Sequence, residues 1–271
     1  MKTWLITGCS SGFGRDIAAA ALARGDNVVA TARRPETLDL DPSDRLLTVA
    51  LDVTRPDQID AAVGAALDRF GRIDVLVNNA GIGSVGAVEL VEPDHLREVM
   101  EVMFFGAVAL TQAVLPHMRT RGSGAIVQIS SQGGQVVFPG YGAYCAAKFA
   151  LEAMSEALAY EVGPHGIHVL IVEPGAFRTS LLSGTMHRSP EIDAYADTAG
   201  ATRRAAEAMD GTQTGDPRKA ADAIITALDA DEPPLRLALG ADAVDTIRAT
   251  HEQRRVDLDA WEQLSRSTDL A

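Results

Sequence analysis

The sequence predicts an α/β fold: a single doubly wound, Rossmann-type domain with about seven parallel strands flanked by helices on both faces. Short apolar runs alternate with longer segments of helical periodicity, a pattern typical of a parallel sheet. A glycine-rich turn joins the first run to the first helical segment, and 271 residues is a length that an open α/β sheet reaches undivided. We therefore expect residues 1–271 to form one domain.

Seven apolar runs mark the expected strands. They cover residues 3–8, 27–32, 46–53, 74–81, 124–131, 167–175 and 235–240. The last run is expected between a helix at 217–229 and a C-terminal helix from 241 to about 264.

Capping and breaking residues place several helix ends. Thr54 is the expected N-cap of a helix with Pro56 just inside it, and Gly71 is expected to close that helix. Gly25 should end the first helix in the same way. Pro116 lies late in a long helical segment, which it should bend or end.

Residues 180–215 form a polar, alanine-rich segment without a strand pattern. Because this segment follows the sixth strand, it should lie over the carboxyl ends of the strands, where open sheets bind ligands. We interpret it as a substrate lid; a plain surface excursion is the alternative.

The net charge of -13 opposes binding to nucleic acid or to an anionic membrane surface. The N-terminal apolar run is too short for a signal peptide or a membrane span. We therefore expect a cytoplasmic protein that binds neither partner. Two cysteines and six scattered histidines lack the spacing of a metal site, so no metal is expected.

Tyr144 and Lys148 are four residues apart in a helical segment, so that the phenol and the ammonium share one face. A nearby cation favours the phenolate, which should lower the pKa of Tyr144 and make it usable as an acid or base. Ser131, at the end of an apolar run, could hydrogen-bond the oxygen that Tyr144 serves. These three catalytic candidates suggest carbonyl and alcohol chemistry.

The turn between the first strand and the first helix has the sequence TGCSSGFG. Its glycines, Gly8, Gly12 and Gly14, would let the backbone approach a pyrophosphate at the helix N-terminus. The spacing differs from G-x-G-x-x-G, but the position after a strand and before a helix predicts a dinucleotide loop rather than a structural turn.

Arg33 and Arg34 stand at the end of the second strand, where a carboxylate would bind a bare ribose hydroxyl. Guanidinium groups can bind a 2′-phosphate through paired hydrogen bonds, and we expect no acidic side chain nearby to repel the phosphate. The pattern favours NADP(H) over NAD(H), which remains possible; two solvated arginines are the alternative.

With these residues in place, the chain resembles the short-chain dehydrogenase/reductase family over essentially its whole length. The resemblance rests on TGCSSGFG, LDVT at 51–54, NNAG at 78–81, Ser131, YCAAK at 144–148 and VEPGAFRT at 172–179. Within the family the chain is most similar to the 17β-hydroxysteroid dehydrogenase-like branch. The resemblance implies a homodimer or homotetramer.

The resemblance also implies which residues hold the cofactor. Asp52 and Val53 would contact the adenine, Thr179 the nicotinamide carboxamide and Lys148 the nicotinamide ribose. Thr179 could also cap the following helix, and Asn79 could cap the end of its strand. The full expected set is Gly8, Ser10, Ser11, Gly12, Phe13, Gly14, Arg33, Arg34, Asp52, Val53, Asn79, Ala80, Gly81, Tyr144, Lys148, Pro174, Gly175, Phe177 and Thr179.

The chain departs from the family at Met103, which matches the position of a catalytic asparagine. A thioether cannot hold a proton-relay water as an amide does, so either the relay takes another route or turnover is impaired. Met103 could shape an apolar substrate pocket, or it could pack in the core, which we favour.

The expected function is NADP(H)-dependent interconversion of a ketone or aldehyde and an alcohol, with Tyr144 as the general acid or base. Met103 motivates an alternative, a cyclase, dehydratase or isomerase that keeps the cofactor without a redox cycle. A third hypothesis is a binding protein that senses NADPH.

Overall fold

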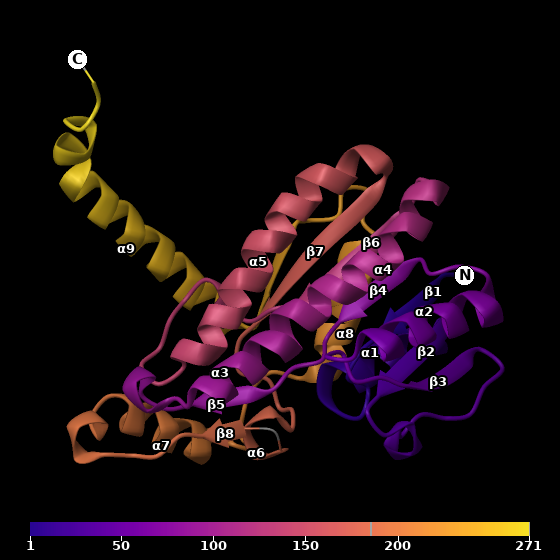
Figure 1. Cartoon of the computed structure of the whole chain (residues 1–271), viewed down its shortest axis with the longest axis horizontal. Helices are drawn as coiled ribbons and strands as arrows, with labels where there is room; N and C mark the ends of the chain where they lie inside the picture. Colours follow the sequence, from indigo (N-terminus) through magenta and orange to yellow (C-terminus); the bar gives the residue numbers. More distant parts are fainter. Residues whose placement is uncertain (185, 271) are drawn as a thin grey trace.

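The computed structural model describes residues 1–184 and 186–270 and contains one seven-stranded parallel sheet (Figure 1). The strand order is β3-β2-β1-β4-β6-β7-β9. The strands are β1 (Thr3–Ile6), β2 (Asn27–Ala32), β3 (Leu46–Ala50), β4 (Val75–Asn78), β6 (Gly124–Ile129), β7 (Ile167–Pro174) and β9 (Arg236–Leu239). All seven lie within the predicted runs, so the predicted fold class is confirmed.

Helices cover both faces of the sheet. Apolar residues of α1 (Gly12–Ala23) and α8 (Pro217–Leu228) pack on one face. Those of α2 (Pro56–Phe70), α4 (Gly106–Arg121) and α5 (Gly142–Val162) pack on the other. The remaining helices are α3 (Pro93–Met100), α6 (Leu181–Gly184), α7 (Ala199–Met209) and α9 (Ala241–Arg266).

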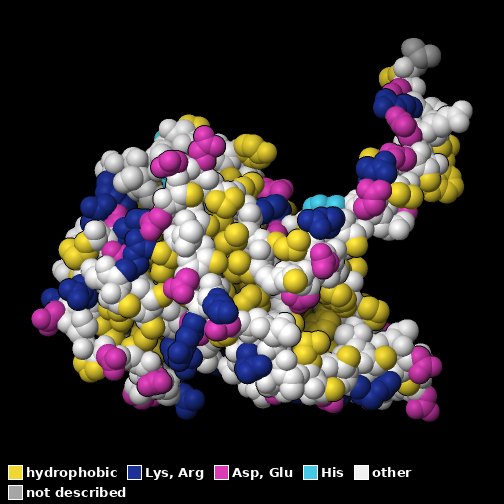
Figure 2. All heavy atoms as spheres, turned by 180° about the vertical axis from the view of Figure 1, so that it is seen from behind, with side chains coloured by type: hydrophobic (Ala, Val, Ile, Leu, Met, Phe, Trp, Pro, Cys, Tyr) yellow, Lys and Arg dark blue, Asp and Glu magenta, His cyan; other side chains and the backbone are white. Residues whose placement is uncertain are grey.

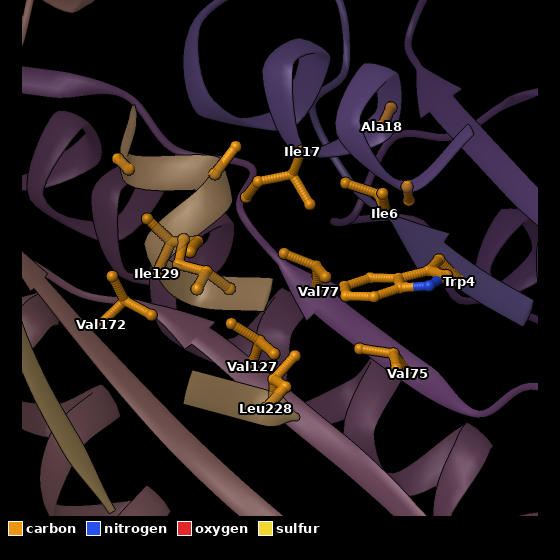
Figure 3. Close-up of a cluster of buried hydrophobic side chains, with 14 of the residues drawn as sticks. Trp4, Ile6, Ile17, Ala18, Val75, Val77, Val127, Ile129, Val172 and Leu228 are labelled. Carbon is orange, nitrogen blue, oxygen red and sulfur yellow. The ribbon is translucent and has the colours of Figure 1, made fainter. Parts of the chain in front are cut away.

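Successive side chains of each strand point to opposite faces, and both faces are covered, which is why the strands are continuously apolar. In β1, Trp4 and Ile6 contribute to the cluster under α1 and α8, whereas Leu5 contributes to the cluster on the other face. Figure 3 shows Trp4 packed among Val75, Val77 and Ile6, and its indole Nε1 donates a hydrogen bond of 3.0 Å to Asp26.

The predicted start of the second helix is wrong by one residue. The N-cap of α2 is Arg55, whose side chain makes no capping hydrogen bond. The Thr54 hydroxyl instead donates to Oδ1 of Asp52 at 2.8 Å, because the Asp52 carboxylate lies within reach of a turn that forms before the helix. Gly71 ends α2 in the left-handed conformation, as predicted.

Pro116 does not end its helix, which continues to Arg121 and is closed by Gly122. Leu110 and Val114 before the proline and Met118 after it are all buried against the sheet. This packing on both sides outweighs the loss of one backbone hydrogen bond. The helical stretch 93–121 is long and apolar enough in composition to cross a membrane, but its buried face packs on the sheet as a core helix does.

The segment 180–215 lies at the carboxyl ends of the strands (Figure 1), and position 185 within it is outside the described residues. The expectation that it contains no strand is wrong. Its β8 (Met186–Arg188) pairs in parallel with β5 (Gly83–Val85). An element of three residues is too short to show a periodic side-chain pattern. It is defined by its backbone pairing with an existing strand, which the sequence does not reveal.

Helix α9 begins against the sheet, where Ala243 and Ile247 are buried, and its C-terminal half projects from the body (Figures 1 and 2). Trp261 and Leu264 on this projection are 65% and 60% exposed. The helix ends two residues beyond the predicted boundary.

Replacing the buried indole tests the core. We expect Trp4→Ala to lower the free energy of unfolding by about 3–5 kcal/mol, since it leaves a cavity and strands Asp26 without one of its donors. Urea denaturation followed by circular dichroism measures the change. The matched control is Trp261→Ala on the exposed half of α9, with an expected change within about 0.5 kcal/mol. Equal losses in both variants would contradict this packing.

Candidate active site

The ends of four neighbouring strands bring the candidate residues into one row. β1, β4, β6 and β7 are adjacent and parallel, so their carboxyl ends lie at the same edge of the sheet. The chain leaves β1 toward one face and β4 toward the other, which opens a crevice where open α/β sheets bind ligands. Thr7, Asn79, Ser131 and Gly175 each lie within two residues of one of these strand ends.

Asn79 ties the end of β4 to the glycine turn after β1. Its Nδ2 donates to the carbonyl oxygens of Thr7 (2.8 Å) and Gly8 (3.1 Å). The Thr7 hydroxyl accepts from the backbone N–H groups of Asn79 and Ala80, both at 2.9 Å. The Asn79 amide therefore fixes the shape of the neighbouring turn after β1, and the Thr7 hydroxyl, not Asn79, caps the end of β4.

The glycines of this turn are required by its geometry. Gly8 and Gly12 have φ values of 69° and 57°, which side chains rarely adopt. A Cβ on Gly14 would lie 2.5 Å from Nδ2 of Asn79 and from the carbonyl oxygen of Gly8. The first turn of α1 can therefore pack directly against the strand ends.

A hollow of about 390 Å³ lies beside the N-terminus of α1. Ser11, the N-cap of α1, makes no side-chain capping bond within the helix, so the first N–H groups of α1 are available to a ligand. Arg15 and Arg178 also line the hollow. Helix N–H groups and guanidinium groups are donors that suit the phosphates of a dinucleotide.

The segment after β7 closes this hollow from the other side. Thr179 approaches Gly12 so closely that a Cβ there would lie 3.3 Å from the threonine side chain. The rings of Phe13 and Phe177 pack with centroids 5.1 Å apart. Oγ1 of Thr179 accepts a bond of 3.5 Å from the N–H of Leu181, consistent with a role at the start of α6.

The carboxyl-end edge of the sheet also holds Ser10, Gly175 and Pro174, the last residue of β7. The side chain of Val53, by contrast, lies in the core. Gly175 donates its N–H to the carbonyl of Leu239 at 2.9 Å, and Ser10 is exposed on the turn after β1. The side chain of Val53 is 7% exposed and belongs to the core beneath α2 and α4. The side chain of Val53 therefore has a packing role.

Arg33 and Arg34 are exposed directly after β2. Within residues 1–184 and 186–270, neither forms an ion pair. The expectation that no acidic group stands nearby is wrong, because Arg33 is close enough to act on Asp52. Burial raises the pKa of Asp52, but hydrogen bonds from Thr54 and the charge of Arg33 outweigh this and hold it below its ordinary value.

The three catalytic candidates meet at the carboxyl end of β6. Lys148 is 5% exposed and its Nζ donates to the carbonyl oxygen of Ile129 at 2.8 Å. That Nζ lies 5.8 Å from the centroid of the Tyr144 ring. Oγ of Ser131 accepts from the N–H of Gly133 at 3.0 Å, and a Cβ on Gly133 would lie 3.2 Å from the Tyr144 ring. Tyr144, Lys148 and Ser131 are therefore brought together as predicted.

The expected lowering of the phenol pKa is wrong for this structure. Loss of water around the hydroxyl raises the pKa of Tyr144 to about 12, and the proximity of Ser131 only opposes that rise. Burial lowers the pKa of Lys148 to about 8, against the influence of Glu152. Burial dominates both groups because the ammonium is directed at Ile129 rather than at the phenol.

Met103 is 2% exposed and packs with Val99 and Ala147 beside Tyr144. The packing interpretation is confirmed. The residue lies on a π-helical turn, Glu101–Phe105, that joins α3 to α4. Its Sδ would be 3.5 Å from a Cβ on Gly81, so the thioether fills the space between the NNAG turn and the helix that carries Tyr144.

Sequence reasoning did not identify Tyr141, Glu152 or Arg236. The Tyr141 and Tyr144 rings meet edge to face at 6.2 Å. Glu152 acts on Lys148 from one helical turn away, and this i,i+4 spacing could have been recognised. Arg236 binds Glu152 from β9, and no sequence signal relates two residues 84 positions apart. The described residues contain no group of three ligands that could hold a metal.

Comparisons with known proteins agree with this geometry. A sequence profile described as short chain dehydrogenase matches residues 2–189. The oxidoreductase BOA17 of Botryotinia fuckeliana is 40% identical over 268 residues, covering 97% of this chain and 98% of that protein. A short-chain dehydrogenase from Streptomyces avermitilis has a TM-score of 0.94 at 52% identity and covers 99% of this chain and 100% of its own.

A third comparison concerns the cofactor. The structure of a short-chain dehydrogenase from Burkholderia cenocepacia, in complex with NADP, has a TM-score of 0.76 at 26% identity, with coverage of 96% of this chain and 98% of its own. The glycine turn, the NNAG turn and the Ser131, Tyr144 and Lys148 group occur together here on a fold shared with these proteins. The chain belongs to the short-chain dehydrogenase family.

Proposed function

We propose that this protein is an NADP(H)-dependent oxidoreductase that interconverts a ketone or aldehyde and an alcohol. The observation that carries the proposal is the meeting of Tyr144, Ser131 and Lys148 at the carboxyl end of β6, at the same edge of the sheet as the hollow at the N-terminus of α1. The family supports a nicotinamide cofactor, and the donors around that hollow fit its phosphates.

In this mechanism the cofactor supplies or accepts the hydride. The Ser131 hydroxyl and the Tyr144 phenol bind the carbonyl oxygen, and Tyr144 donates its proton to that oxygen as the alcohol forms. A phenol with a pKa of about 12 keeps its proton at neutral pH, which suits it to act as the acid. Lys148 supplies positive charge from a site with little water, where charge acts more strongly than in solvent.

The preference for NADP(H) rests on Arg33 and Arg34. Both side chains are exposed at the end of β2, next to the glycine turn that follows β1. Without ion-pair partners among the described residues, they are available to a 2′-phosphate. Asp52 moderates this preference, since its carboxylate already attracts Arg33.

We propose that residues 180–215 act as a substrate lid. The β5–β8 pairing holds the segment to the body, as does the stacking of His95 and His187, whose ring centroids are 3.6 Å apart. The Tyr195 hydroxyl also donates to Glu89. Because the sequence resembles the 17β-hydroxysteroid dehydrogenase-like branch, we propose that hydroxysteroids be tested among the substrates.

The partners expected from the sequence remain proposals. We propose a cytoplasmic homodimer or homotetramer that acts on a small molecule and binds neither nucleic acid nor membrane. The net charge of -13 supports the last point, because it repels phosphates. Light scattering on the purified protein measures the assembly.

Removing the phenol hydroxyl tests the chemistry. Tyr144→Phe should lower kcat about a hundred- to ten-thousand-fold, since it deletes the proton donor, while leaving NADPH affinity nearly unchanged. Turnover of ketones, aldehydes and hydroxysteroids is followed by nicotinamide absorbance. Tyr160→Phe, on the exposed side of the same helix, should retain full activity. The mechanism is wrong if Tyr144→Phe keeps wild-type turnover.

Reversing one charge tests the cofactor preference. The wild type should bind NADPH at least about tenfold more tightly than NADH, and Arg33→Asp should narrow or reverse that ratio by repelling the 2′-phosphate. Isothermal titration of both cofactors gives the affinities. Arg248→Asp on α9 is an exposed control that should leave the ratio unchanged. Equal wild-type affinities would refute the preference.

A further inference from the structure

A buried carboxylate, Glu152, stands one helical turn after Lys148 on α5. It is 3% exposed, and residues four apart share a helix face, so it extends the face that carries Tyr144 and Lys148. An ionised carboxylate is rarely buried unless it is paired. Its environment therefore indicates what it does.

Both oxygens of Glu152 are bound. Oε1 accepts from the hydroxyl of Ser130 at 2.5 Å, and Oε2 accepts from Nη1 of Arg236 at 2.5 Å. Arg236 also binds Glu173 of β7, and Glu156 at 2.7 Å. The carboxyl group is thus held by one residue after the end of β6 and one at the start of β9, and not by its own helix.

The bond to Ser130 couples Glu152 to the catalytic turn. Ser130 is 3% exposed and directly precedes Ser131. A Cβ on Gly134, at the end of the same turn, would overlap the Glu152 carboxyl group, so the turn packs directly on it. Displacing the carboxyl group would therefore release the segment that orients the Ser131 hydroxyl.

Glu152 is also the acidic group that acts on Lys148. The ammonium is buried and donates to a neutral carbonyl at Ile129, which does not compensate a full charge. Burial lowers the pKa of Lys148 to about 8, and the charge of Glu152 opposes that fall. Without it, the lysine would lose its proton at a still lower pH.

The charged groups around Glu152 come from α5, β7 and β9. Lys148 and Glu156 share its helix, Arg236 belongs to β9 and Glu173 to β7. Burial, with the charge of Glu173 adding to it, raises the pKa of Glu152 above its ordinary value, and hydrogen bonds from Ser130 and Arg236 only partly oppose that rise. The bond that Arg236 donates to Oε2 is charge-assisted and favours the carboxylate form against that rise.

We propose that Glu152 is a positioning residue for the catalytic group: its carboxylate keeps Lys148 protonated and, through Ser130, holds the turn that presents Ser131. Glu152 itself touches neither substrate nor cofactor in this scheme. The consequence for catalysis rests on the proposed function, but the effect on Lys148 is a property of the folded chain and can be measured without turnover.

The first experiment is a lysine titration by NMR. The chain has three lysines, Lys2, Lys148 and Lys219, so protein labelled with 13C at the lysine Cε gives three signals, assigned by Lys2→Arg and Lys219→Arg. Glu152→Gln keeps the shape of the side chain and should lower the titration midpoint of Lys148 by about one pH unit. An unchanged midpoint in the folded variant would overturn the proposal.

Two further variants make this result specific. Glu156→Gln removes a carboxylate that also binds Arg236 but lies a further turn from Lys148, and it should leave the midpoint in place. Equal shifts in Glu152→Gln and Glu156→Gln would show a general ion-cluster effect and contradict the proposal. If Glu152→Gln does not fold, Glu152→Asp, with its withdrawn carboxylate, should shift the midpoint in the same direction; no shift would again refute it.

The second experiment is the pH dependence of turnover with NADPH. Activity that needs a charged Lys148 is lost as pH rises through the lysine pKa, so Glu152→Gln should lose activity at lower pH than the wild type, and Glu152→Asp should recover part of the difference. If the wild type turns over no carbonyl, the proposed function is wrong, but the effect of Glu152 on the titration of Lys148 is still tested by NMR. An NMR shift without any change in the activity profile would overturn the catalytic part of the inference.

Discussion

The site depends on a lysine ammonium that is held away from water at the end of β6. Lys148 donates to the carbonyl of Ile129, the last residue of that strand, so the charge is fixed to the sheet and does not move with a surface loop. Keeping a charge in such a place is costly unless other groups compensate it. Glu152, which Ser130 and Arg236 bind, supplies a negative charge one helical turn after Lys148 and so meets that requirement in part.

The cofactor end of the site obeys a different constraint, which is close approach. Gly14 packs where any side chain would overlap Asn79, and Asn79 in turn binds the carbonyls of Thr7 and Gly8. The turn after β1 and the turn after β4 therefore form one unit. The proposed reaction needs the cofactor and the proton donor in fixed register, and β1, β4 and β6, which are neighbours in one sheet, would supply that rigidity.

Much of this was predictable because periodicity and short-range geometry are written in the sequence. Tyr144 and Lys148 share a helix face by spacing alone, and Gly71 ends its helix because it tolerates a positive φ. What failed depended on the folded neighbours. Packing on both sides of Pro116 kept its helix intact, and β8 exists only because β5 is available to pair with it.

The predictions about the pKa of Tyr144 and the charges near Arg33 were wrong for the same reason. Spacing placed a cation near Tyr144 but could not show that the ammonium turns toward Ile129, or that burial determines the direction of both pKa shifts. Likewise, Asp52 approaches Arg33 only because β2 and β3 are paired. The direction of a pKa shift follows from burial and from the nearest charges, and both are properties of tertiary structure.

Met103 packs against α5 and Glu152 belongs to it, and the two side chains give the helix an apolar and a charged neighbourhood. Where the family resemblance implies an amide, the π-helical turn presents a thioether that packs against Tyr144 and offers no donor. Further along α5, a carboxylate is fully bonded to Ser130 and Arg236. Polar support for the Tyr144 and Lys148 pair therefore comes from the β6 and β9 side of α5, while the side that faces the π-helical turn is apolar. A substrate carbonyl at Tyr144 would lie between these two environments. The Glu152 carboxylate would act on it through Lys148, and the apolar Met103 side chain would lie beside the phenol.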